Sequence, residues 1–349
     1  MNAPSHCPKT GEHFIMRPRQ MHAYDANVER RTSGEYAHLY WQKLRETILA
    51  CGGEVDTVPP TRFRGLRDRS AMFVRDTGVM IYHEDTAMMV IPTQHSARMH
   101  GESRALKPAM EARGIVQMPL PGSMEGGNIV FDAHRNTLYW GVNNREHMRE
   151  LERKGDQFHP AWRRSPEKKR IAEHIHKTDM IHSDAKALAT ASAVLDGHAK
   201  VEKNNAPFQV IPMFVPDRHS VEFYHLDGAL GILPSGQMVV CREALSHVSQ
   251  RAIAASGADI YPVSMEEARL GATNFITVGG HVITPYASPG LKQFFEKQGY
   301  AVIDPPSVGL PRGAWQFGPM AGVRCATLKT TRDMGFPAAP QPDAGRGRA

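Results

Sequence analysis

The fold is decided by a repeated unit whose clearest copy reads Leu291-Lys292-Gln293-Phe294-Phe295-Glu296-Lys297-Gln298-Gly299-Tyr300-Ala301-Val302-Ile303. The apolar residues Leu291, Phe294 and Phe295 recur at the spacing of one helical face. Gly299 predicts the end of this helix, because glycine adopts the left-handed backbone conformation without a Cβ clash. The run Ala301-Val302-Ile303 predicts a short strand directly after it.

The unit recurs along the chain. Apolar residues at helical spacing also precede Gly52, Gly114, Gly155 and Gly257. Short strand-like runs follow three of these glycines, at residues 55–58, 115–118 and 260–263. A repeat of roughly 40–60 residues, each with a helix and several strands, predicts a closed pseudo-symmetric α/β array. An ordinary α/β protein with no repeat stays open as the alternative at this point.

The first of these helices illustrates the expected details. Ser33 is its expected N-cap, because a serine hydroxyl can accept a hydrogen bond from an unpaired backbone N–H of the first turn. Its apolar face is expected to consist of Tyr36, Leu39, Tyr40, Leu44, Ile48 and Cys51.

The wide interval between Gly155 and Gly257 predicts a helical insertion at about residues 156–205. It is charged and helix-prone, and we interpret it as a lid or an oligomer contact rather than a separate domain. Residues 332–349 are rich in Pro, Ala and Gly and predict a disordered tail, and residues 1–15 are expected to be flexible. We therefore expect one domain over residues 16–331.

Composition excludes several classes of protein. The chain has 349 residues, of which 41% are hydrophobic and 22% charged, as in an ordinary globular protein. The net charge of +6 is mild and the basic residues are scattered, so we expect no nucleic-acid partner. No apolar run approaches the roughly 18–20 residues of a membrane span, so we expect no membrane partner. Four cysteines and no signal-like start predict a reducing, cytoplasmic location.

Two stretches in the first half are candidates for chemistry. Met72-Phe73-Val74-Arg75-Asp76-Thr77-Gly78 predicts an apolar strand that ends in a charged pair, where a side chain can face a cleft. Met124-Glu125-Gly126-Gly127-Asn128-Ile129-Val130-Phe131 places two glycines between a glutamate and a strand, so that backbone can approach a ligand closely. A solvated turn and a simple Gly-Gly turn are the alternative interpretations.

Two more candidates lie in the second half. In Phe223-Tyr224-His225-Leu226-Asp227-Gly228, a strand would point the His225 and Asp227 side chains to one face. Gly322-Val323-Arg324-Cys325-Ala326 places a lone cysteine after a glycine-rich loop, as either a nucleophile or a buried structural thiol.

Metal and cofactor chemistry is not expected. The chain has no Cys-x-x-Cys and no His-Glu-x-x-His pattern. His174 and His176 stand two residues apart in a predicted helix, so their side chains diverge.

The order of the four stretches, Asp, Glu-Gly-Gly, His-Leu-Asp and a late Cys, resembles the guanidino-group modifying enzymes of the pentein superfamily. These are the arginine deiminases, dimethylarginine dimethylaminohydrolases and amidinotransferases. The resemblance covers about residues 16–331. It implies a five-bladed α/β propeller of pseudo-symmetric ββαβ modules, which would account for the repeated helix–glycine–strand unit.

The resemblance also implies roles for individual residues. Cys325 matches the nucleophile, His225 the general acid/base and Glu125 the carboxylate beside that histidine. Asp76 and Asp227 are substrate-binding positions, and Asp76 matches the acid that binds the guanidinium. Arg98 and Arg145 resemble the arginines that bind the substrate's carboxylate. Three carboxylates suit this substrate, because paired charge-assisted hydrogen bonds can hold a flat cation in place.

The implied activity is a cysteine-dependent hydrolase of an arginine-type substrate. It would form a covalent amidino-thioether on Cys325 and release a ureido product with ammonia or an amine. An amidinotransferase is the alternative, and a non-catalytic pentein binding module is the alternative of another class. Asn128 stands where the family has an aspartate, and many dimethylarginine hydrolases have a lysine at the position of Asp227, so the subclass stays open. A homo-oligomer also stays open.

Overall fold

The computed structural model describes residues 11–17, 28–58, 62–63, 66–67, 74–83, 86–92, 106–120, 126–141, 209–213, 215, 219, 223, 225–316 and 322–330, with the backbone alone for 28–37 and several strand residues. The expected insertion at 156–205 and tail at 332–349 lie outside the described residues. The predicted helix end at Gly155 lies outside them as well.

Within this part of the chain, five three-stranded sheets share one topology. In each, the middle strand pairs antiparallel with one neighbour and parallel with the other. The sheets are β5 Val79–His83, β6 Thr86–Pro92 and β7 Val116–Leu120; β8 Ile129–Asp132, β9 Thr137–Gly141 and β10 Gln209–Met213; β11 Leu230–Ile232, β12 Met238–Val240 and β13 Ile260–Pro262; β14 Ile276–Val278, β15 His281–Ile283 and β16 Ala301–Ile303; and β17 Thr327–Lys329, β1 His13–Met16 and β2 Glu54–Thr57. A two-stranded sheet, β3 (Arg62–Phe63) and β4 (Leu66–Arg67), accompanies them.

Helices make the crossovers that parallel pairing requires. They are α1 (Val28–Ala50) between β1 and β2, residues 106–111 between β6 and β7, α7 (His247–Ala255) between β12 and β13, and α9 (Pro289–Lys297) between β15 and β16. The short α8 (Met265–Arg269) leads from β13 to β14. The predicted ββαβ module is thus present in four copies, and the connection from β9 to β10 lies outside the described residues.

The glycine ends of these helices were predicted correctly. Gly52, Gly114, Gly257 and Gly299 have φ values of 88°, 66°, 68° and 86°, all in the left-handed region. The predicted N-cap of the first helix was wrong, because α1 begins at Val28 and Ser33 lies inside it.

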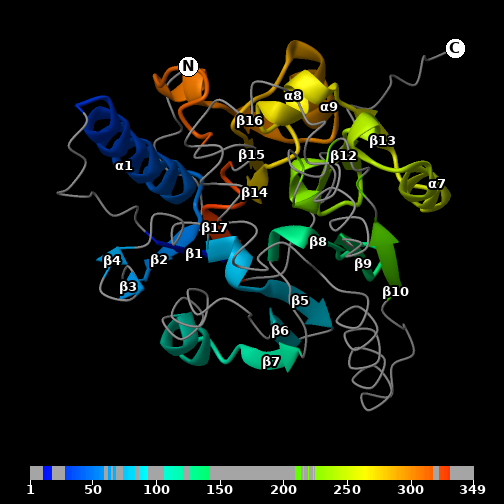
Figure 1. Ribbon diagram of the computed structural model, residues 1–349, viewed down its shortest axis with the longest axis horizontal. Helices are drawn as coiled ribbons and strands as arrows, with labels where there is room; N and C mark the ends of the chain where they lie inside the picture. Colours follow the sequence, from blue (N-terminus) through cyan, green and yellow to red (C-terminus); the bar gives the residue numbers. More distant parts are fainter. Residues whose placement is uncertain are drawn as a thin grey trace, which may run out of the picture.

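The helices pack their apolar faces against the sheets, which places the cores between the two layers. Leu291 and Phe295 of α9 are completely buried and pack with Phe275 and the sheet β11–β13. Leu44 and Ile48 of α1 are buried against β1 and β14. In Figure 1, β5, β8, β14 and β17 lie around the middle of the molecule and α1, α7 and α9 toward its edge.

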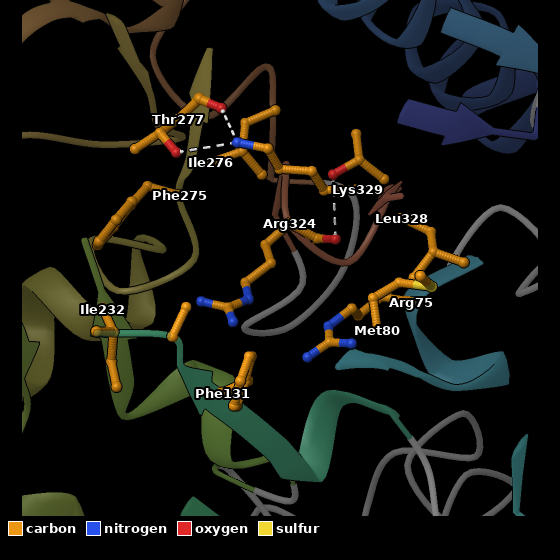
Figure 2. A pocket seen from close by; sticks show the side chains of 12 residues that line it. Arg75, Met80, Phe131, Ile232, Phe275, Ile276, Thr277, Arg324, Leu328 and Lys329 are labelled. Carbon is orange, nitrogen blue, oxygen red and sulfur yellow. Dashed lines mark hydrogen bonds between the residues drawn. The ribbon is translucent and has the colours of Figure 1, made fainter. Parts of the chain in front are cut away.

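In each three-stranded sheet, we call the strand that pairs antiparallel with the middle strand the first strand; these are β5, β8, β11, β14 and β17. All five first strands line one cavity of about 90 Å³. Figure 2 shows this cavity with Arg75 and Arg324 extending their guanidinium groups toward it. The strand residues that line it include Met80 on β5, Phe131 on β8, Ile232 on β11, Ile276 on β14 and Leu328 on β17. The fold is mixed α/β, and all five three-stranded sheets border this cavity. None of the helices in the described ranges has the length and apolar character of a membrane span.

Candidate active site

The segments that precede the first strands meet at one end of the sheets. The 3-10 helices η2 (Val74–Thr77), η3 (Gly126–Asn128) and η4 (Leu226–Gly228) precede β5, β8 and β11. Helix η2 contacts η3, and η3 contacts η4. Asn274 precedes β14, and Cys325 precedes β17. The four candidate stretches of the sequence are therefore brought together, with Asn274 as a fifth neighbour.

Two glycines allow this close packing. A Cβ on Gly126 would overlap the backbone carbonyl oxygen of Arg75, and a Cβ on Gly127 would lie 2.5 Å from Nδ1 of His225. Glycine is required where backbone approaches other groups so closely. Helix η3 is thus held between η2 and the imidazole of His225.

Arg75 links the first and the last stretch. Its Nη1 and Nη2 donate hydrogen bonds to the carbonyl oxygens of Gly78 and Ile129, at 3.1 and 2.6 Å. Its backbone N–H donates to the carbonyl oxygen of Cys325 at 3.4 Å. The loop that carries Cys325 is therefore hydrogen-bonded to η2.

The sulfur of Cys325 lies between a carboxylate and an amide. The thiol is 3% exposed, and its Sγ lies 3.6 Å from Oδ2 of Asp227. Nδ2 of Asn274 donates to Sγ at 3.1 Å. The other carboxylate oxygen of Asp227 is buried and has no hydrogen-bond partner in the described structure. A buried unpaired carboxylate oxygen is unfavourable, so this site favours a ligand that donates hydrogen bonds.

The loop before β14 fixes Asp227. The hydroxyl of Thr273 donates to the carbonyl oxygens of Asp227 and Gly228, at 3.1 and 2.7 Å. His225, which is 6% exposed, is the N-cap residue of η4 and has an extended backbone. One tight turn therefore carries both the imidazole and the carboxylate.

Similar proteins are found by structure rather than by sequence. No family model and no curated protein matches the chain. Solved structures do match it. The N-terminal domain of ArgZ, an arginine dihydrolase from cyanobacteria, has a TM-score of 0.61 at 19% identity, covering 92% of this chain and 98% of that one. DDAH from Pseudomonas aeruginosa has a TM-score of 0.58 at 15% identity, covering 91% and 99%.

The chain has the pentein fold. Unliganded AgrE matches with a TM-score of 0.61 at 20% identity, and the match covers 92% of this chain and 39% of AgrE. The pentein fold implied by the order of the four stretches is thereby confirmed.

Within this pentein fold, two local predictions were wrong. Residues 225–227 are not a strand, because the carbonyls of His225 and Leu226 accept the hydrogen bonds of a 3-10 turn from Gly228 and Ala229. Residues 74–77 are a 3-10 helix rather than the end of a strand, and the hydroxyl of Thr77 donates to the carbonyl oxygen of Val74. In each place a 3-10 turn directly precedes the first strand of its sheet.

Some predicted site residues cannot be placed. Glu125, Arg98 and Arg145 lie outside the described residues, although Glu125 directly precedes η3 in the sequence. Asp76 belongs to η2, and its side chain is outside the description. Their roles stay predictions.

Asn274 is the site residue that the sequence reasoning missed. The repeat itself carried the signal, since each candidate stretch precedes the first strand of its sheet. Asn274 holds the same place before β14.

The other described cysteines lie in the apolar cores. Burial raises the pKa of the Cys241 thiol to about 11, and this side chain is completely buried in the core. Cys51 packs in a core cluster beneath α1. Among the described side chains there is no group of three His, Cys, Asp or Glu residues that could hold a metal ion.

Proposed function

We propose that this protein is a cysteine-dependent hydrolase of a guanidino substrate of the arginine type. The observation that carries the proposal is the buried sulfur of Cys325, which lies 3.6 Å from the Asp227 carboxylate and 3.1 Å from the Asn274 amide. The fold adds support. ArgZ is described as an arginine dihydrolase and has been solved with its substrate and with a covalently bound reaction intermediate, and DDAH has been solved with citrulline.

We infer further that the five sheets close into a five-bladed propeller. Their shared topology and the cavity lined by all five first strands support closure. The pairing of β17 with β1 also joins the two ends of the described chain in one sheet.

The negative charge of the site suits a guanidinium. Asp227 is 1% exposed and keeps one carboxylate oxygen unpaired. A planar cation that donates parallel hydrogen bonds compensates such a carboxylate better than water does. Asp76 on η2 and Glu125 directly before η3 would complete the acidic cage.

We propose the following reaction. His225 accepts the thiol proton of Cys325, and the thiolate attacks the central carbon of the guanidinium. The resulting imidazolium protonates the departing nitrogen, and the C–N bond breaks to leave an amidino-thioether on the sulfur. His225 then deprotonates a water that attacks the same carbon. The C–S bond breaks, and the ureido product leaves with the thiolate restored.

The remaining predicted residues would select the substrate. Arg98 and Arg145 would bind an α-carboxylate by bidentate ion pairs. This assignment makes arginine or an N-methylated arginine the substrate to test first.

The test is a substrate panel read out for ureido product. Arginine and its N-methylated forms are incubated with the wild type, with Cys325→Ser and with His225→Ala. Citrulline from the wild type, none from Cys325→Ser, and a covalent adduct on the Cys325 peptide of an acid-quenched sample support the proposal. Added glycine separates the alternative, because ornithine with an amidinated amine would indicate an amidinotransferase. No turnover of any guanidino compound by the folded wild type would refute the proposal.

A further inference from the structure

We propose that Asn274 is a catalytic residue of this site, whose amide nitrogen stabilises the thiolate of Cys325 while its amide oxygen fixes the loop that carries it. The inference rests on the proposed function for its role in turnover. The ionisation of the thiol can be tested without any substrate.

The amide oxygen of Asn274 organises the nucleophile loop. Oδ1 accepts hydrogen bonds from the backbone N–H groups of Gly322, Arg324 and Cys325, at 3.1, 3.0 and 3.3 Å. A carbonyl oxygen has two lone pairs, so three donors saturate it. The loop before β17 therefore has its backbone fixed by one side chain.

These three bonds also decide the orientation of the amide. In the flipped orientation the NH₂ group would face three N–H donors, which is unfavourable. The NH₂ group must therefore face the sulfur, and Nδ2 lies 3.1 Å from Sγ. Hydrogen bonds accepted by the amide oxygen polarise the group and strengthen its N–H donors.

A donor at this place favours the thiolate. Hydrogen bonding to the charged form of a group stabilises that form, and the thiolate is the nucleophile. The Asp227 carboxylate on the other side, 3.6 Å from Sγ, has the opposite effect when no cation is bound. Asn274 thus offsets the negative charge that substrate recognition requires beside the sulfur.

The rest of the segment holds Asn274 rigidly. Its side chain is completely buried, and its backbone N–H donates to the carbonyl oxygen of Gly271 at 3.0 Å. On one side Thr273 is hydrogen-bonded to η4, and on the other Phe275 packs edge-on against Phe295 at 5.1 Å. A rigid donor is what preorganised stabilisation of a charge needs.

The test compares Asn274→Asp with Asn274→Ala. An aspartate keeps an oxygen for the three backbone N–H groups but turns a second oxygen, instead of an NH₂ group, toward the sulfur. The loop should stay in place while the thiolate is repelled. Alanine removes both functions. Thr284→Val is the matched control, because Thr284 is completely buried after β15 and its hydroxyl hydrogen-bonds to the backbone carbonyl and N–H of Tyr286 rather than to the nucleophile loop.

The readout is the rate of iodoacetamide alkylation of the Cys325 peptide between pH 5 and 10, followed by mass spectrometry. For Asn274→Asp we expect a melting temperature near that of the wild type and a midpoint at least one pH unit higher. A hydrogen bond to a charged group gives an expected loss of about 10- to 100-fold in alkylation at pH 7 and in kcat, with KM changed less. Thr284→Val should keep the wild-type midpoint.

Either variant can overturn the inference. A wild-type alkylation midpoint in Asn274→Asp, or in Asn274→Ala should the aspartate variant not fold, would reduce Asn274 to a structural residue. Failure of the proposed function gives a different result, namely a thiol whose ionisation depends on Asn274 in a protein that turns over no guanidino compound.

Discussion

Replacing Gly127 with alanine tests whether the imidazole of His225 is a catalytic group. The new Cβ would lie 2.5 Å from Nδ1, 2.7 Å from Cγ and 3.0 Å from Cε1 of His225. Gly127 is absent from the glycines with positive φ, so its backbone accepts an alanine without strain. An ordinary Cβ contact starts at about 3.4 Å, so the ring must move by about 1 Å.

A displacement of about 1 Å at a catalytic group costs roughly 100-fold in rate. We therefore expect Gly127→Ala to lower kcat for ureido formation by about that factor and to alter the pH dependence of kcat. Steady-state kinetics between pH 5 and 9 measure both. Gly114→Ala is the matched control, because a Cβ there meets nothing within 4 Å. It should lose some stability at its left-handed φ and keep wild-type turnover.

A folded Gly127→Ala with wild-type kcat and an unchanged pH profile would refute the assignment of His225. Iodoacetamide labelling of Cys325 in this variant checks the link between the two groups. Labelling should be slower near neutral pH, because the displaced His225 accepts the thiol proton less well, and should return to the wild-type rate at about pH 10, where the thiol ionises without a base.

Two further outcomes are expected. Thr273→Val removes the hydroxyl that donates to two carbonyl oxygens of η4. It should lower the free energy of unfolding, measured in urea, by about 1–3 kcal/mol, and it should raise KM by moving Asp227. An unchanged KM would show that Asp227 does not bind substrate. Burial, reinforced by Arg113 and opposed by Asp56, lowers the pKa of His13 from 6.5 to about 4. The unfolded chain therefore binds more protons in this interval, and stability should fall as the pH drops from about 6.5 toward 4. Urea midpoints of His13→Asn, compared with those of the wild type at pH 6.5 and 4.5, should show a smaller fall, and equal falls would contradict this origin.

The ends of the helices could be predicted from the sequence, because they depend on single residues rather than on distant contacts. A helix that ends at Gly52 or Gly299 needs a left-handed residue, and glycine supplies it whatever the surroundings. The helix start was not local in the same way. Ser33 was the expected N-cap of the first helix, yet α1 begins five residues earlier, at Val28. Leu39, placed on the buried face by periodicity, is 51% exposed.

The sequence predicted which stretches form the site but not the local structure of each stretch. Alternation alone indicated that His225 and Asp227 share a strand face, whereas tertiary hydrogen bonds from Thr273 hold that segment as a 3-10 turn. Asn274 carries no charge and no nucleophile, so residue type did not single it out. Its importance follows from three backbone donors that come from a loop far along the chain.

The pairing of β1 with β17 has a consequence for how the protein is made. The ion pair between Glu12 and Lys329, which fastens these two strands, joins residues 317 positions apart. A ribosome working from the N-terminus releases β1 early and must translate the other four sheets before its antiparallel partner emerges. Throughout that time β1 exposes an unpaired edge, which is a site for wrong pairing. Cys325, the proposed nucleophile, leaves the ribosome just ahead of β17, so it emerges only when this edge can be covered.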